Sequence, residues 1–274
     1  MGDGPQNGRS PLQSIAAIAA VAIVAYAIAN VAHEGSHGVA CILVGGRPVA
    51  ISAVYFDCDE TGVAPGVLKW IPASGTLVNL VLAGAALLVL RSLKRTASTE
   101  RYFWWLLVTV NALQASGYWL FSGVANIGDW ARVIDGLGPH WLWRVGLGAI
   151  GAVAYLAVIR FSLEELGAFL APGPGLVQQA RRLTLVPYLA GGALYVTAGL
   201  LNPLSLGLVL ISAAAASFGG TSAMAWMFTL ADLPRWSSAE AVEPFSPALS
   251  RAWMAGALIS AVGFIAVLGP SVTF

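Results

Sequence analysis

Long stretches of this chain carry no charged side chain, and this feature restricts the folds open to it more than any other. A helix that crosses a bilayer needs about 20 apolar residues. Only 10% of the 274 residues are charged and 58% are hydrophobic, whereas a soluble domain is about 25% charged. We therefore expect an all-α polytopic membrane protein, because the apolar runs are far too long for barrel strands.

Six or seven apolar runs are long enough to be transmembrane helices. The first covers residues 14–32 and continues past a charged interruption to residue 44. The others cover residues 71–90, 102–125, 142–159, 183–201, 204–231 and 252–268. We expect residues 1–13 to be a tail, residues 14–135 to form a catalytic three-helix membrane core, and residues 136–274 to add helices that act as a scaffold or a gate.

Lys and Arg are concentrated in alternate connections between the runs. Residues 91–101, 160–182 and 232–251 are rich in them, whereas residues 45–70 and 130–141 are poorer. Cytoplasmic loops carry an excess of Lys and Arg. The pattern predicts an integral, multi-pass protein with a cytoplasmic N-terminus, and the net charge of +1 gives no indication of a nucleic-acid partner.

The connection after the first run differs in composition from the others. Gly45 and Gly46 end the helix, residues 47–56 are rich in β-branched and aromatic side chains, and residues 57–62 form a polar turn. This pattern predicts a short strand-like hairpin at the membrane edge. The two cysteines, Cys41 and Cys58, are too few for a disulfide scaffold and match no CxxC metal pattern.

The first apolar run contains the HExxH motif His33-Glu34-Gly35-Ser36-His37. Histidines four positions apart lie on one helix face, so both imidazoles can reach one metal ion. The carboxylate of Glu34 can face the same metal and act as a general base toward water. The motif predicts His33 and His37 as metal ligands and Glu34 as the catalytic residue.

The position of the motif strengthens this interpretation. Two of the three histidines fall within it, and ionisable groups inside an apolar helix are costly and by default functional. Seven apolar or small residues follow His37, which places the motif about 10 Å below the interface at 1.5 Å per residue. The competing interpretation is that these side chains only hydrogen-bond to other helices and hold the bundle together.

A catalytic zinc needs a third protein ligand, and Asp129 is the candidate. One run separates the first from the third, so these two point the same way and end at the same membrane face. Asp129 follows the third run directly. Its competing interpretation is a residue of a helix-terminal turn, and we expect Asp135 and His140 to be interfacial loop residues.

The order of these segments resembles the site-2 protease family of intramembrane zinc metalloproteases. Family members read HE-x-GH, then a glycine-rich strand, an AGP-x-x-N helix start and an N-x-x-P-x-x-x-LDG segment. The counterparts in residues 14–135 are His33-Glu34-Gly35-Ser36-His37, Gly45-Gly46-Arg47-Pro48-Val49, Ala73-Ser74-Gly75-Thr76-Leu77-Val78-Asn79 and Asn126-Ile127-Gly128-Asp129. Ser36 stands where the family has glycine, and the last segment lacks its proline and following glycine.

The resemblance implies a zinc cofactor held by His33, His37 and Asp129, with Glu34 as the base. It also places Asn79 near the substrate channel, and Asn79 and Asn126 are the candidate substrate-binding residues. The predicted function is a zinc endopeptidase that hydrolyses peptide bonds in or near transmembrane segments. Its expected partners are the bilayer and a membrane protein substrate of the single-pass type, held in an extended form by edge pairing with residues 47–56.

Two alternative functions belong to other classes. The first is a zinc-binding membrane regulator without turnover, and retention of Glu34 disfavours it because a structural site needs no base. The second is a transporter in which His33, Glu34 and His37 line a proton or metal pathway. Transporters often contain two similar halves, and the second half of this chain has no matching motif.

Overall fold

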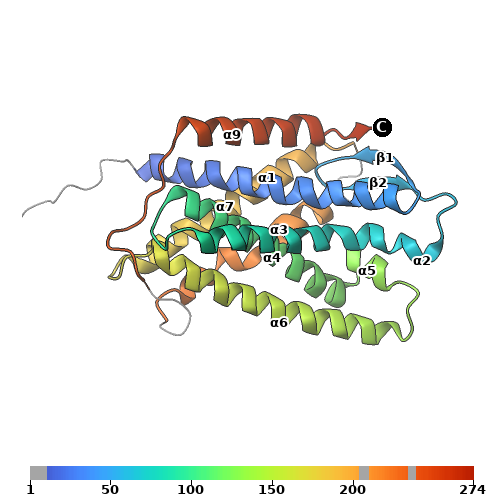
Figure 1. Ribbon diagram of the computed structural model, residues 1–274, viewed down its shortest axis with the longest axis horizontal. Coiled ribbons are helices and arrows are strands. Elements are labelled where there is room, and N and C mark those ends of the chain that lie inside the picture. Colours follow the sequence, from blue (N-terminus) through green and yellow to red (C-terminus); the bar gives the residue numbers. More distant parts are fainter. Residues whose placement is uncertain (1–10, 204–209, 234–238) are drawn as a thin grey trace, which may run out of the picture.

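Long helices lie side by side in the computed structural model, which describes residues 11–203, 210–233 and 239–274 (Figure 1). The α-helices and strands are α1 (Pro11–Leu43), β1 (Arg47–Ile51), β2 (Phe56–Asp59), α2 (Pro65–Leu68), α3 (Trp70–Ser92), α4 (Thr99–Ala125), α5 (Asp129–Ile134), α6 (His140–Leu166), α7 (Leu176–Leu200), α9 (Arg251–Val262) and β3 (Val272–Thr273). Shorter 3-10 or π-helical segments are η1 (Gly167–Phe169), η2 (Leu210–Gly219), η3 (Ser222–Ala225), η4 (Met227–Leu230) and η5 (Gly263–Leu268).

Five helices among the described residues are long and apolar enough to cross a membrane. They are Leu12–Leu43, Pro65–Ser92, His140–Phe169, Leu176–Leu200 and Arg251–Leu268. They match the first, second, fourth, fifth and seventh of the expected runs. A mainly helical chain with several candidate spans agrees with the predicted fold class, while the exact number of spans stays a prediction.

The third and sixth expected runs behave differently. Residues 102–125 lie in the 27-residue helix α4, which is absent from the candidate spans because polar side chains interrupt its apolar sequence. Thr109, Asn111 and Gln114 are buried inside the bundle.

The expectation of one long helix over residues 204–231 is wrong for its described part, 210–231, which forms η2, η3 and η4. Gly219 and Gly220 lie where the π-helical segment η2 ends, since glycine has low helix propensity.

One hydrophobic core is shared by the predicted catalytic part and the remaining helices. Helix α1 packs against α3, α7 and α9, and α4 packs against α3 and α6. Tyr26, Trp105 and Tyr195 are among the largest fully buried side chains of this core. Close van der Waals packing of such large side chains is what holds helices together where lipid surrounds them. The helices beyond residue 135 therefore support the first three rather than forming a core of their own.

The predicted hairpin is present, and it belongs to a small sheet of three strands with the order β2-β1-β3. Strand β1 pairs antiparallel with β2, and Ala50 and Ile51 also pair with β3 near the end of the chain. Both edges of β1 are thus occupied at these residues. The expectation that residues 47–56 offer a free edge is wrong for β1, and among the described residues the outer strands β2 and β3 each have an unpaired edge.

A disulfide joins the sheet to the first helix. Cys41 and Cys58 form this bond between the last turns of α1 and strand β2. Phe56 lies on Gly38, where a β-carbon would be 2.8 Å from the Phe56 ring. The hairpin is therefore held directly against the last two turns of α1, just beyond the HExxH motif.

Candidate metal centre

His33 and His37 lie on one face of α1, as their spacing predicts. Their ring centroids are 4.9 Å apart, and both side chains are buried. The ring of Tyr118, from α4, stacks on His33 at 5.0 Å between centroids. The two imidazoles are thus enclosed between helices and not exposed to lipid.

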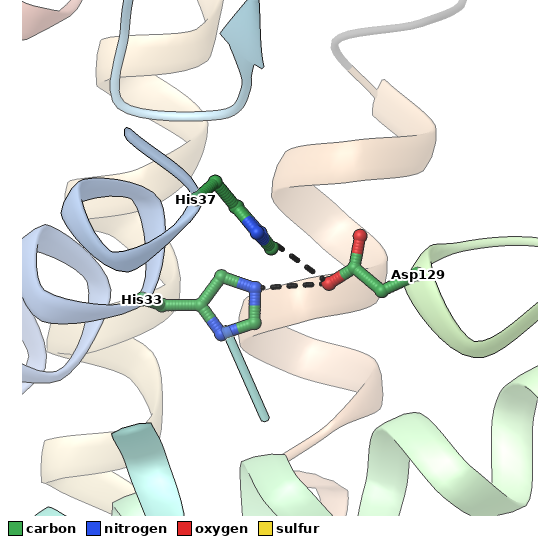
Figure 2. Close-up of side chains that lie close together, drawn as sticks. All are labelled: His33, His37 and Asp129. Atoms are coloured by element: carbon green, nitrogen blue, oxygen red, sulfur yellow. Dashed lines mark hydrogen bonds and ion pairs between the residues drawn. The ribbon is translucent and has the colours of Figure 1, made fainter. Parts of the chain in front are cut away.

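Asp129 reaches the two histidines from the start of α5. Helix α4 ends at Asn126 in the left-handed conformation, and Gly128 turns the chain with a φ of 83°. Figure 2 shows the Asp129 carboxylate pointing at both imidazoles. Its Oδ2 is 3.1 Å from His33 Nε2 and 3.6 Å from His37 Nε2. The structure therefore brings the three predicted ligands together, although Asp129 follows His33 by 96 positions in the sequence.

The donor set fits a zinc ion in both chemistry and spacing. One donor atom from each of the three side chains lies within 4.8 Å of the others. Two imidazole nitrogens and a carboxylate oxygen are ligands that zinc accepts at about 2.0–2.2 Å, which puts neighbouring ligand atoms of a tetrahedral site about 3.3 Å apart. The two measured separations from Asp129 bracket that value.

Both histidines are oriented through their second ring nitrogen. His33 Nδ1 lies 3.3 Å from Asn79 Oδ1, and His37 Nδ1 lies 2.7 Å from the Ile71 carbonyl oxygen. Because both partners are acceptors, each Nδ1 is the protonated nitrogen, and each Nε2 keeps a lone pair that points toward Asp129. Metal-binding histidines are typically held in this way.

Trp130 anchors the segment that carries Asp129. Its Nε1 donates a hydrogen bond of 2.8 Å to the Oγ1 of Thr76, a fully buried residue of α3. Helix α3 therefore positions all three candidate ligands, through Asn79, Ile71 and Thr76.

The two predicted substrate-binding residues differ in where they lie relative to the metal site. Asn79 is fully buried; its amide donates to Gln114 Oε1 at 2.9 Å while its oxygen faces His33. Asn126 is exposed, and its Oδ1 lies 3.0 Å from His140 Nε2. Neither side chain is among those that line the cavity beside the metal site. We therefore interpret Asn79 as a positioning residue for His33.

Replacing Asn79 with Ala is expected to weaken zinc binding by about 10- to 100-fold, because loss of an outer hydrogen bond frees the His33 ring. Zinc titration of the purified protein against a competing chelator measures the change. Asn126→Gly is the control, since glycine keeps the left-handed conformation, and its zinc affinity should equal that of wild type. Equal affinity for wild type and Asn79→Ala would contradict the positioning role.

A cavity of about 500 Å³ adjoins the three candidate ligands. Glu34 lines it together with residues 53–56 of the hairpin and small residues of η2: Ala213, Ala215 and Ala216. Ile127, Gly128 and Arg132 also line it and are exposed, so the cavity reaches the surface beside α5. Its position lets water reach Glu34 and the ligands together.

Sequence reasoning missed several residues that shape this site. Tyr118 carries no spacing signal, because its contact with His33 depends on how α4 packs against α1. Gly75 is part of a family-like segment, but only the structure shows it against both imidazoles. A β-carbon there would be 2.5 Å from His33 Nε2 and 2.7 Å from His37 Cε1.

Comparison of the chain with protein-family models, curated proteins and solved structures gives no significant match. Its function is therefore inferred from the residues of the site and their geometry.

Proposed function

We propose that this protein is a multi-pass membrane zinc metalloprotease that hydrolyses peptide bonds in or near transmembrane segments of other proteins. The observation that carries the proposal is the convergence of His33, His37 and Asp129, with donor atoms within 4.8 Å of one another, on a cavity lined also by Glu34. This combination supplies three metal ligands and a base that a purely structural site would not need.

Each part of the site has a role in such a reaction. Zinc, when bound, polarises a carbonyl group and lowers the pKa of water. Glu34 accepts a proton from the attacking water while the water oxygen forms a bond to the carbonyl carbon of the substrate. Glu34 then gives this proton to the amide nitrogen as the carbon–nitrogen bond breaks.

The cavity walls suit an unwound stretch of a membrane protein. A helix hides its carbonyl groups in internal hydrogen bonds, so the substrate must become extended before attack. Strand β2 has an unpaired edge, and its first residue, Phe56, lines the cavity. Pairing with this edge would hold a peptide in extended form beside Glu34. The small side chains of η2 that also line the cavity leave room for apolar side chains of the substrate.

Metal analysis tests the zinc site directly. Protein purified in detergent without chelators should contain one zinc per chain, and His37→Ala should lose it, because two ligands hold a catalytic zinc poorly. His140→Ala is the matched control. It removes the third histidine, which lies outside the site, and should keep zinc at the wild-type level. Wild-type protein without bound metal would contradict the proposal.

A further inference from the structure

Lys and Arg side chains gather at the end of the bundle remote from the metal centre. Helix α3 ends and α4 begins at this end, where Arg95 and Arg101 both pair with Glu165 near the end of α6. Among the described residues this end carries Arg91, Lys94, Arg95, Arg101, Arg160, Arg181, Arg182 and Arg251. The end with the sheet, α2 and α5 carries Arg47, Lys69, Arg132 and Arg144.

Nearby acidic groups do not change what this asymmetry indicates. Arg95 pairs with Glu240 as well as Glu165, so the net charge of the basic end is smaller than its count of Lys and Arg. Membrane orientation, however, follows the number of Lys and Arg in short connections, and Asp and Glu contribute little. The basic end is therefore the one expected on the cytoplasmic side.

The disulfide indicates the same orientation by an unrelated argument. Cys41 follows His37 by one helical turn and is bonded to Cys58 of β2. Disulfides persist in oxidising compartments and are rare in the cytosol, where thiols are kept reduced. This bond lies at the end of the molecule that holds the sheet and α5, opposite the basic end (Figure 1).

The cavity beside the metal centre reaches the surface at this disulfide-bearing end. Phe56, two residues before Cys58, lines the cavity, and so do the exposed residues Gly128 and Arg132. The bond thus holds the hairpin wall of the cavity against α1.

We infer that the catalytic cavity opens on the side of the membrane away from the cytoplasm. Its substrates are then membrane proteins cut in or beside the end of a spanning segment on that side. The orientation rests on the Lys and Arg asymmetry and the Cys41–Cys58 bond, and only the substrate class rests on the proposed function. The extended segment of the substrate pairs with the β1–β2 hairpin, and the Cys41–Cys58 disulfide holds this hairpin in position.

Accessibility of single introduced cysteines tests the orientation. Ala64, before α2, and Ala97, between α3 and α4, are both exposed. In the full-length protein, Ala64→Cys should react with a membrane-impermeant maleimide on intact cells. Ala97→Cys should react only after the cells are permeabilised. The reverse pattern would overturn the inference, and neither result depends on cleavage.

The state of the native cysteines is measured in the same cells. Thiols are blocked before lysis, and a polymer-linked maleimide is added with or without prior reduction. We expect a mass shift of two polymers only after reduction, and a Cys41→Ser variant should show one polymer at most. Cys41 and Cys58 that are free in wild-type cells would overturn the inference.

Two single-pass reporters identify the side of the membrane on which substrates are cut. Both carry the same cleavable sequence, one at the cytoplasmic end of the spanning helix and the other at the outer end. Loss of the full-length reporter that depends on Glu34 is expected only for the one with the sequence on the outer side. Glu34-dependent cutting of the other reporter would overturn the inference and support the protease function. If neither is cut while zinc is bound and Ala64→Cys is labelled in intact cells, the orientation stands and the proposed function fails.

Discussion

Replacement of Glu34 by Gln is expected to lower the cleavage rate by about 10²- to 10⁴-fold, the usual contribution of a general acid–base group, while zinc stays bound. Glutamine has nearly the same shape as glutamate but cannot accept and return a proton. Glu34 lies outside the group of His33, His37 and Asp129 that could hold the metal, so that group is left intact. Cleavage of a membrane reporter and the zinc content of the same preparation are the two measurements.

The matched control for this experiment is Glu100→Gln, which removes an exposed carboxylate in the first turn of α4, at the basic end. Its cleavage rate and zinc content should equal those of wild type. A Glu34→Gln variant that cuts at the wild-type rate would show that another group acts as the base. Wild-type protein that binds zinc but cuts no membrane protein would favour the regulator alternative.

The candidate site could be predicted largely because its parts are encoded locally or by counting helices. The four-residue spacing of His33 and His37 requires only that their segment be helical. Asp129 follows from direction alone, because a helix and the second helix after it must end at the same face. The hairpin is indicated by the β-branched composition of residues 47–56. Each of these inferences needs only local sequence or the order of the helices along the chain.

Other features depend on helix rotation or on tertiary pairing, which spacing does not encode. Asn79 lies under His33 and away from the cavity because of the way α3 is turned toward α1. Cys58 meets Cys41 only because the hairpin folds back onto α1. The third strand joins residues 272–273 to β1, more than 220 positions earlier. Such long-range contacts have no periodic signature in a single sequence.

Hydropathy alone also fails to identify a long helix in the centre of the bundle. Gln114 of α4 donates to the hydroxyl of Tyr195 at 3.2 Å and accepts from Asn79. Neighbouring helices satisfy these polar groups, so α4 tolerates side chains that lipid would not. A helix enclosed by others can be long and polar, and for this reason counting apolar runs does not determine the number of spans.

Substitution of Gly75 by Ala is expected to remove nearly all zinc and cleavage activity, although it adds only one methyl group. That methyl would lie 2.5 Å from His33 Cε1 and Nε2 and 2.7 Å from His37 Cε1, so both rings must move. Helix α3 cannot simply retreat, because Ile71 and Asn79 of the same helix bind the other nitrogens of these rings. Overpacking of this kind costs about 1–3 kcal/mol, and here the displaced atoms are the ligands themselves.

Gly84→Ala is the control on the same helix, since a β-carbon at Gly84 meets no atom within 4 Å. It should keep zinc and activity, and gain up to about 1 kcal/mol of helix stability from the better propensity of alanine. Thermal unfolding of both variants in detergent separates a local effect from general destabilisation. Zinc loss in Gly75→Ala with both variants still folded at the assay temperature would place the effect at the imidazoles. A Gly75→Ala protein with full zinc and activity would mean that α3 does not press on the two histidines, and the metal site would need a different geometry.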